Sequence, residues 1–90
     1  MSTINVFAFS SVTCVPCKHI KPVLLDLKED YPTYRWTFVD INNDPEGYTK
    51  YYNISNVPSM VVVKDDAIVG THKGTHAMGY LYLLKQASRQ

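Results

Sequence analysis

The feature that most constrains the fold of this chain is a pair of cysteines, Cys14 and Cys17, separated by two residues. The apolar run 6–9 before the pair is typical of a buried strand. After the pair, apolar side chains recur at helical spacing, at Ile20, Val23, Leu24, Leu27 and Tyr31. A Cys-x-x-Cys at the junction of a strand and a helix, in a chain that continues to alternate the two, predicts a redox-active dithiol.

The position of Cys14 at the start of the predicted helix, 15–30, favours a thiolate. Unpaired backbone N–H groups and the positive end of the helix dipole lie there, and Lys18 adds a nearby cation. We expect the pKa of Cys14 to fall from about 8.5 to about 7, which raises the thiolate fraction at neutral pH roughly fifteenfold and improves the sulfur as a leaving group. Cys14 is therefore the predicted nucleophile and Cys17 the predicted buried resolving thiol. Pro16 fits a first helical turn, where no N–H is needed.

Length, charge and the N-terminal residues limit the classes of protein that fit. Ninety residues predict a single domain, 1–90, large enough for a core without structural disulfides or metals. A net charge of +1 gives no electrostatic basis for binding nucleic acid or a membrane surface. Residues 1–5 lack a basic segment, and the apolar run after them is too short for a signal peptide or a membrane span. We therefore expect a cytoplasmic protein, whose two cysteines do chemistry rather than cross-link the fold.

Hydrophobic periodicity and turn residues predict seven elements in the order β-α-β-α-β-β-α. Strands are expected at residues 4–9, 35–41, 60–63 and 67–69, and helices at 15–30, 45–52 and from 77 to near the C-terminus. This order predicts an α/β fold with a central four-stranded mixed sheet. A right-handed crossover joins a parallel pair of strands, an antiparallel hairpin follows, and helices cover both faces.

Capping and turn residues set the expected ends of these elements. Asp44 is the predicted N-cap of the short second helix, and Pro45 its first residue. Asp65 and Asp66 predict a two-residue hairpin connection with Asp66 at positive φ, unless the turn is longer. Gly74 ends the last strand, and Thr75 is the predicted N-cap of the last helix. The apolar stripe of that helix is expected to comprise Ala77, Leu81, Leu84 and Ala87.

These motifs together resemble those of the thioredoxin superfamily over nearly the whole chain. The matching segments are Cys14-Val15-Pro16-Cys17-Lys18, Pro22, Val39-Asp40-Ile41-Asn42, Asp44-Pro45-Glu46, Val57-Pro58-Ser59 and Gly74. Full-length thioredoxins begin with an extra strand and helix that this chain is too short to hold. The resemblance therefore implies the minimal thioredoxin fold, βαβαββα, as in glutaredoxins and small phage and archaeal relatives.

The resemblance also implies a substrate-binding surface around the dithiol. It implies that the Val57–Pro58 peptide bond is cis and lies against the disulfide, where the backbone of Val57 pairs with an extended substrate segment. The implied docking rim comprises Thr13, Val15, Pro16, Val57, Pro58, Lys73, Gly74 and Thr75.

The sequence departs from the thioredoxin pattern beneath the resolving cysteine. Thioredoxins place a buried aspartate there, paired with a lysine on the next strand, and the matching positions in this chain are Ala8 and Phe38. Loss of both charges together avoids an uncompensated buried charge. We expect the proton of Cys17 to leave through water, and the resolving step to be slow near neutral pH.

The predicted function is that of a dithiol-disulfide oxidoreductase, a protein-disulfide reductase and electron carrier acting through Cys14 and Cys17. The resemblance implies a monomer without bound cofactor or metal, protein disulfide substrates, and electrons from NADPH through a flavin-dependent thioredoxin reductase. Glutathione is the alternative donor, although the Cys-Pro-Tyr-Cys and Gly-Gly-x-x-Asp segments of glutaredoxins are not visible here. A docking module with dispensable cysteines is a second alternative.

Other roles for the cysteine pair carry less weight. The two thiols could be an inert pair on a helix. His72 and His76 have the H-x3-H spacing found beside cysteine pairs in zinc sites. They are far from the cysteines in sequence, however, and Gly74 interrupts any helix that would carry both. Haem attachment through Cys-x-x-Cys-His is excluded because Lys18 follows the second cysteine.

Overall fold

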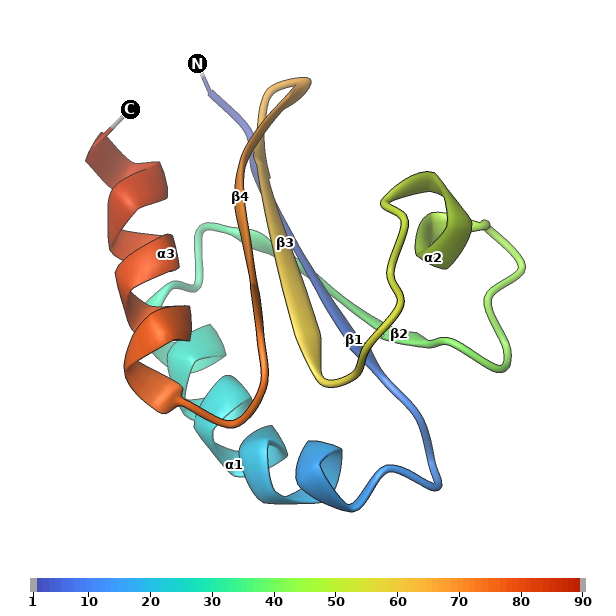
Figure 1. The fold of residues 1–90 in the computed structure, drawn as a ribbon. Coiled ribbons are helices and arrows are strands. Elements are labelled where there is room, and N and C mark those ends of the chain that lie inside the picture. Colours follow the sequence, from blue (N-terminus) through green and yellow to red (C-terminus); the bar gives the residue numbers. More distant parts are fainter. Residues whose placement is uncertain (1, 90) are drawn as a thin grey trace.

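The computed structural model describes residues 2–89 and shows the predicted order of elements (Figure 1). In that part of the chain the strands are β1 (Ile4–Ser10), β2 (Arg35–Asp40), β3 (Ser59–Lys64) and β4 (Ala67–Lys73). The helices are α1 (Val15–Asp30), α2 (Tyr48–Tyr51) and α3 (Ala77–Arg89).

The strands form a mixed sheet in the order β2-β1-β3-β4. β1 is parallel to β2, while β1 with β3 and β3 with β4 are antiparallel pairs. Residues 6–9 of β1 and 59–63 of β3, the two central strands, are buried throughout. Such strands are covered on both faces, which explains why their sequences lack the apolar–polar alternation of a half-exposed strand. The predicted α/β fold with a four-stranded mixed sheet is confirmed.

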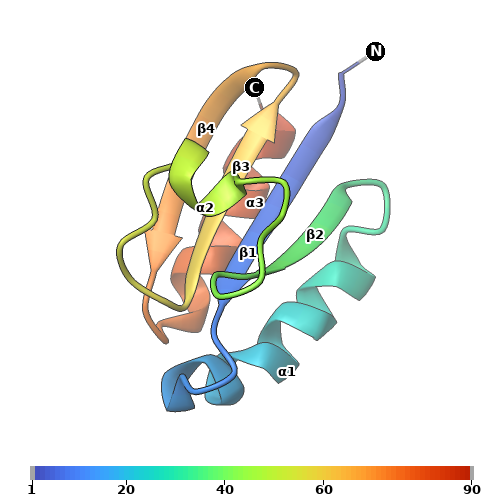
Figure 2. The ribbon, with the colours of Figure 1, turned by 90° about the vertical axis from the view of Figure 1, so that its right-hand side faces the viewer.

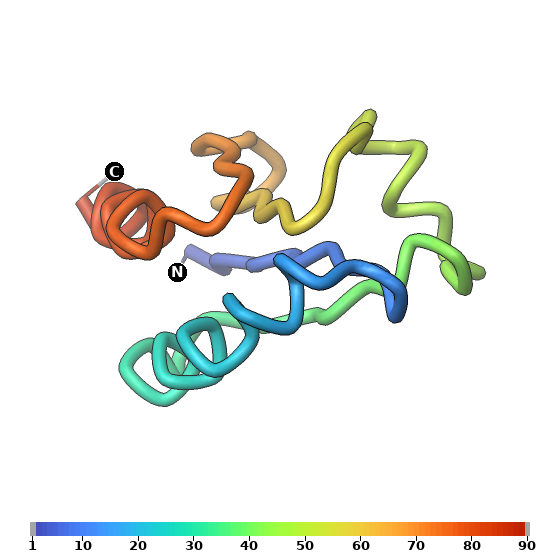
Figure 3. Tube along the Cα trace, turned by 60° about the horizontal axis from the view of Figure 1, so that its bottom comes forward, coloured from blue at the N-terminus to red at the C-terminus, as the bar shows by residue number. Residues whose placement is uncertain are grey.

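Helices cover the two faces of the sheet unequally. α1 and α3 pack on one face and α2 lies over the other, as Figures 2 and 3 show. The core between the sheet and the α1/α3 layer is mainly aliphatic and comprises Val6, Ala8, Ile20, Leu24, Leu27, Met60, Val62, Tyr80, Leu83, Leu84 and Ala87. On the α2 face, tyrosine rings pack against a core made of Phe7, Phe9, Val39, Val61 and Val63.

Helix α1 has the bounds predicted from its apolar spacing. Its buried side chains recur at helical intervals, at Cys17, Ile20, Leu24 and Leu27. At its start, Cys14 has extended backbone angles (φ −88°, ψ 107°) and occupies the N-cap position. At its end, the N–H of Tyr31 donates to the carbonyl of Leu27 at 2.9 Å. Cys14 therefore lies at the N-terminus of the helix, and Cys17 lies on its buried face.

Helix α2 is a single turn and starts later than predicted. It spans Tyr48–Tyr51 and follows Gly47, whose φ of 75° lies in the left-handed region. The prediction of Asp44 as N-cap and Pro45 as first helical residue is therefore wrong. Asp44 still stabilises this turn because its Oδ2 accepts a hydrogen bond from the N–H of Thr49 at 2.7 Å. This hydrogen bond also lowers the pKa of Asp44.

The β3–β4 hairpin has the predicted two-residue connection, but positive φ falls on Asp65 (56°) and not on Asp66. β4 continues to Lys73, well past the predicted strand 67–69, and its backbone pairs with β3 along this extension. The residues of the extension are polar, which an edge strand open to solvent on one face tolerates. Gly74 ends the strand as predicted, with φ +98°.

Helix α3 begins at Ala77, so that His76 precedes it and the predicted N-cap, Thr75, lies one position outside. Ala77 and Leu81 of the predicted stripe are only partly buried. The buried face comprises Tyr80, Leu83, Leu84 and Ala87. The buried stripe is therefore rotated relative to the prediction and brings a tyrosine into the core.

Candidate active site

The two cysteines form a disulfide with a Cα–Cα distance of 5.2 Å at the mouth of α1. The Sγ of Cys14 accepts a hydrogen bond from the N–H of Cys17 at 3.1 Å, which is the contact of an N-cap side chain with its helix. Cys14 is half-buried, whereas Cys17 is 5% exposed. The first sulfur is therefore the more accessible of the two, in agreement with the predicted order.

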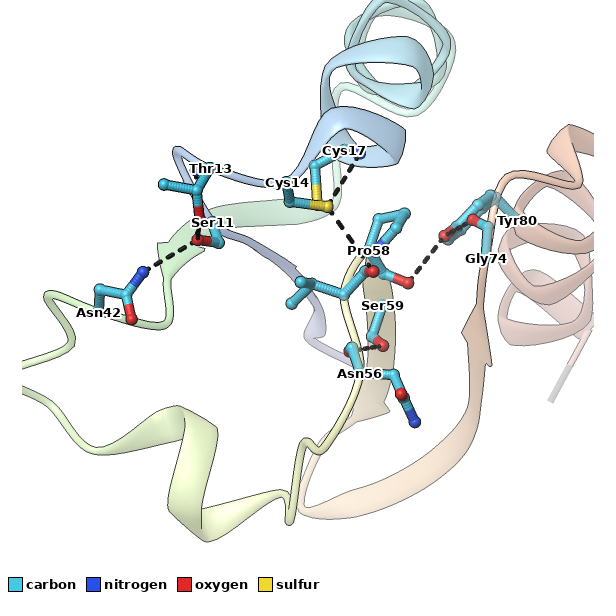
Figure 4. Close-up of a disulfide and its surroundings, with 11 residues drawn as sticks. Ser11, Thr13, Cys14, Cys17, Asn42, Asn56, Pro58, Ser59, Gly74 and Tyr80 are labelled. Carbon is cyan, nitrogen blue, oxygen red and sulfur yellow. Dashed lines mark hydrogen bonds between the residues drawn. A yellow bond between two sulfur atoms is a disulfide. The ribbon is translucent and has the colours of Figure 1, made fainter.

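The loop before β3 brings backbone carbonyl groups to the disulfide (Figure 4). The Val57–Pro58 peptide bond is cis, as the resemblance implied. The Sγ of Cys14 lies 3.7 Å from the carbonyl oxygen of Val57. On the other side of this loop, the N–H of Gly74 donates to the carbonyl of Pro58 at 2.9 Å. The loop before β3 therefore contacts the sulfur of Cys14 through Val57 and contacts Gly74 through Pro58.

The residues of the predicted docking rim differ in exposure. Val15 is 59% exposed, Val57 and Gly74 are half-buried, and Pro58 is buried. The exposed members are Thr13, Val15, Pro16, Lys73 and Thr75. The rim therefore offers an apolar side chain and backbone groups beside Cys14, while the ring of Pro58 packs inside.

Tyr80 is a site residue that the sequence did not single out. Its side chain is 1% exposed, and its hydroxyl donates to the carbonyl of Gly74 and lies 3.5 Å from that of Pro58 (Figure 4). Burial raises the pKa of Tyr80 to about 12. Tyr80 therefore links the loop before β3 to the loop after β4. A tyrosine at helical spacing predicts core packing, and nothing in the sequence pattern indicates the partners of its hydroxyl.

Ser11 is a second residue that sequence reasoning missed. The side chain of Asn42 donates to Ser11 Oγ at 2.9 Å, and Ser11 Oγ lies 3.1 Å from the hydroxyl of Thr13. The N–H of Cys14 donates to the carbonyl of Ser11 at 3.1 Å. The turn before the first cysteine is therefore fixed to the end of β2. The Ser-x-Thr pattern was the available signal, since such hydroxyls often bond within their own turn.

A cavity of about 620 Å³ lies beside the disulfide, and Cys17 is one of the residues that line it. Ala8 and Phe38, which face each other in the register of β1 and β2, also line it. The two positions at which the thioredoxin pattern has an aspartate–lysine pair thus line the same cavity as Cys17. Among the described residues that line the cavity, Asp40 carries the one carboxylate.

A family model for thioredoxin matches residues 2–84. The chain belongs to the thioredoxin family. It is 36% identical to the putative thioredoxin H10 of Arabidopsis thaliana over 91% of this chain and 58% of that protein. A thioredoxin of Staphylococcus saprophyticus is 32% identical, over 77% of this chain and 70% of that protein.

A solved thioredoxin structure from Schistosoma mansoni has the same fold, with a TM-score of 0.85 and 28% identity, over 93% of this chain and 76% of that one. The chain spans only 50 to 58% of the length of several curated thioredoxin relatives. The family and its fold are therefore established.

The histidines of the zinc alternative contact each other and not the cysteines. His72 Nε2 lies 3.1 Å from the carbonyl of His76, and the ring of His72 packs edge-on against Tyr80 at 4.5 Å. Within residues 2–89, no three histidine, cysteine or carboxylate side chains are grouped so that they could hold a metal ion. In the same part of the chain, every helix is too short or too polar to cross a membrane.

Proposed function

We propose that this chain reduces protein disulfides by thiol-disulfide exchange, with Cys14 as nucleophile and Cys17 as resolving thiol. The observation that carries the proposal is the placement of the disulfide at the N-terminus of α1, with the more accessible sulfur beside the carbonyl of Val57. Membership of the thioredoxin family supports the same chemistry.

The reaction starts from the reduced pair. The thiolate of Cys14 attacks one sulfur of a substrate disulfide, so that a mixed disulfide forms and one substrate thiolate leaves and takes a proton from water. Cys17 then loses its proton and attacks the sulfur of Cys14, which closes the internal disulfide and releases the second substrate thiol. Two electrons pass from the chain to the substrate.

The helix mouth supports the first of these steps. The N–H of Cys17, in the first turn of α1, donates to the Sγ of Cys14, and this contact and the helix dipole stabilise the anionic form of that sulfur. The same stabilisation makes Cys14 a good leaving group when Cys17 attacks it. We therefore expect the pKa of the Cys14 thiol to lie near 7 in the reduced protein, as proposed for thiols in this setting.

A substrate segment would bind in extended form across the loop before β3. The backbone of Val57 would pair with it, and the side chains and backbone of Thr13, Val15, Pro16, Pro58 and Gly74 would border it. Main-chain pairing of this kind gives affinity without demanding a particular sequence. This suits a reductase that acts on more than one protein.

For the electron source we propose NADPH through a flavin-dependent thioredoxin reductase, acting on a cytoplasmic monomer without bound cofactor. Neither a Cys-Pro-Tyr-Cys site nor a Gly-Gly-x-x-Asp segment is present, so the glutathione carboxylate lacks the glutaredoxin clamp. Glutathione is therefore the weaker candidate donor.

The test is an insulin-reduction assay run in parallel with two donor systems. One holds NADPH and thioredoxin reductase, the other glutathione and glutathione reductase. We expect turnover with the first and little with the second, and none for the C14S/C17S variant. Equal turnover with glutathione alone would overturn the proposed donor. Inactivity of the wild type in both systems would overturn the proposed reductase activity. If cells that carry C14S/C17S then behave like cells that carry the wild type, the chain is a docking module.

A further inference from the structure

The cavity beside Cys17 is lined mainly by apolar side chains. Its volume of about 620 Å³ falls in the range of pockets that hold small molecules. The floor is formed by buried side chains from two elements, Ala8 of β1 and Ile20 and Leu24 of α1. A molecule in this half-open cavity would contact mainly apolar groups on its protein side.

Large apolar side chains are also left open to solvent at its rim. Val12 is 71% exposed, Leu25 44% and Phe38 41%, and all three line the cavity. They come from the loop before Cys14, from α1 and from β2. Exposed apolar groups gathered around one hollow mark a place where an apolar ligand removes them from water.

The charged groups of the rim are mainly positive. Lys18, Lys21 and Lys28 lie along one flank of α1, and Asp40 lies on β2, so that the lining carries three positive charges and one negative charge, a balance of +2. Lys28 Nζ lies 5.8 Å from the centre of the Phe38 ring and thus reaches over the cavity. This charge balance favours an anionic occupant.

The spacing of the lysines indicates how much charge the occupant carries. From Lys18 to Lys28 the helix rises about 15 Å, at about 1.5 Å per residue. Only one or two of these ammonium groups can therefore reach the same anionic group. A polyphosphate would need converging cations, whereas a single carboxylate is matched by Lys21 and Lys28.

We propose that this cavity binds a small amphipathic carboxylate, with its apolar chain over the floor and its carboxylate at Lys21 and Lys28. The stretch of α1 from Cys17 to Leu25 is about 12 Å long, which is the length of an extended chain of about ten carbon atoms. The far end of such a chain lies against Cys17 and Ala8. The cavity lining includes Cys17 and Pro58, so this site adjoins the surface around Val57 where protein substrates are proposed to bind.

Decanoate is the probe, titrated into the oxidised protein by calorimetry and followed by amide NMR. We expect saturable binding at one site, with shifts at Ala8, Cys17, Leu25 and Phe38. Octanoate lacks two methylene groups and should bind about tenfold more weakly. Decyltrimethylammonium, which has the same chain and the opposite charge, should not bind.

Two variants locate the site. K21E/K28E should weaken decanoate binding at least tenfold, while K50E/K85E makes the same change of net charge at exposed lysines outside the cavity and should leave the affinity unchanged. A8L places a larger side chain on the floor and should abolish binding. Because K21E/K28E alters only exposed side chains, the test does not depend on the folding of A8L.

Three results would overturn the proposal. They are no saturable binding of decanoate by the wild type, equal loss of affinity in the two lysine pairs, and NMR shifts that map away from the cavity. None of these measurements needs insulin reduction, so failure of this proposal is distinguishable from failure of the proposed reductase activity.

Discussion

The two sulfurs of the disulfide lie in contrasting surroundings. Cys14 is half-buried among backbone polar groups, with the N–H of Cys17 at 3.1 Å and the carbonyl of Val57 at 3.7 Å. Cys17 is 5% exposed and borders an apolar cavity. A helix mouth stabilises a thiolate, and apolar surroundings stabilise a neutral thiol. The difference supports the proposal that Cys14 attacks the substrate and that Cys17 resolves the mixed disulfide.

The two sides are also held in place by different forces. Hydrogen bonds donated by Tyr80 and Gly74, and one that the carbonyl of Ser11 accepts from the N–H of Cys14, position the loops around Cys14. Packing of Ala8 and Ile20 and their neighbours shapes the Cys17 side. Substitutions that remove one of these hydrogen bonds should therefore change the surroundings of Cys14. Substitutions that change the cavity should change the surroundings of Cys17.

The largest expected effect comes from replacing each cysteine singly. C14S should lose at least a thousandfold in insulin turnover because no nucleophile remains. C17S should still attack and then stop as a mixed disulfide, which mass spectrometry of the trapped complex would detect. Trapping by C14S and not by C17S would reverse the assignment of the two sulfurs.

Introducing the missing aspartate and lysine near Cys17 should change how Cys17 loses its proton in the resolving step. A8D/F38K places a carboxylate and an ammonium at facing positions of β1 and β2. A nearby general base should speed the resolving step at pH 7 about tenfold or more. Because Ala8 is 3% exposed, a carboxylate at this position should lower the free energy of unfolding by about 1–4 kcal/mol. Stopped-flow reduction and urea unfolding measure the two effects.

The control variant is D40N, because the carboxylate of Asp40 already lines the cavity and could itself accept the proton of Cys17. D40N should leave the resolving rate of the wild type nearly unchanged if the proton leaves through water. A marked slowing in D40N would make Asp40 the base. An unchanged pH profile in A8D/F38K would remove the idea that the missing charges limit the resolving step.

Removing the hydroxyl of Tyr80 tests the hydrogen-bonded side. Y80F leaves the carbonyl of Gly74 without its donor and should lower the free energy of unfolding by about 1–2 kcal/mol. Insulin reduction should slow a few-fold, with the pKa of Cys14 unchanged. Y82F changes a tyrosine that is 66% exposed and should stay within about 0.5 kcal/mol of the wild type. Equal effects of Y80F and Y82F would contradict the bridging role.

The smallest expected effect is a pH dependence that belongs to the same tyrosine. Burial raises the pKa of Tyr80 to about 12 in the folded chain, from 10.0. Because the folded value is the higher one, the contribution of neutral Tyr80 to stability is complete below pH 10 and is lost as pH rises from 10 to about 12. The stability advantage of the wild type over Y80F should therefore shrink in urea titrations between pH 9 and 11. A constant or growing advantage would contradict it.

Elements with many local signals were predictable from the sequence. The bounds of α1 follow from its apolar spacing, and the order of the elements along the chain follows from the hydrophobic periodicity and the turn residues. β4 was predicted too short because its polar end, up to Lys73, is a strand only through its pairing with β3. The start of α2 was misplaced because the backbone of Gly47 breaks the turn that Asp44 and Pro45 would otherwise begin.

In the candidate site, too, features that are local in sequence were predictable and features that depend on distant residues were not. The cysteine pair and the loop at Pro58 were recognisable as motifs, since each is local in sequence. The roles of Tyr80 and Ser11 depend on partners distant in sequence, Pro58 and Asn42, that periodicity does not reveal. The cavity arises from a small side chain at Ala8 beside an outward-facing Phe38, which only the packed structure brings together.

The most direct measurement of the central claim is the rate of alkylation of Cys14 by iodoacetamide as a function of pH, in the C17S variant so that one thiol reports alone. If the helix mouth stabilises the thiolate, the rate should rise to half its maximum near pH 7, about 1.5 units below an unperturbed cysteine. A midpoint above pH 8 would contradict the account.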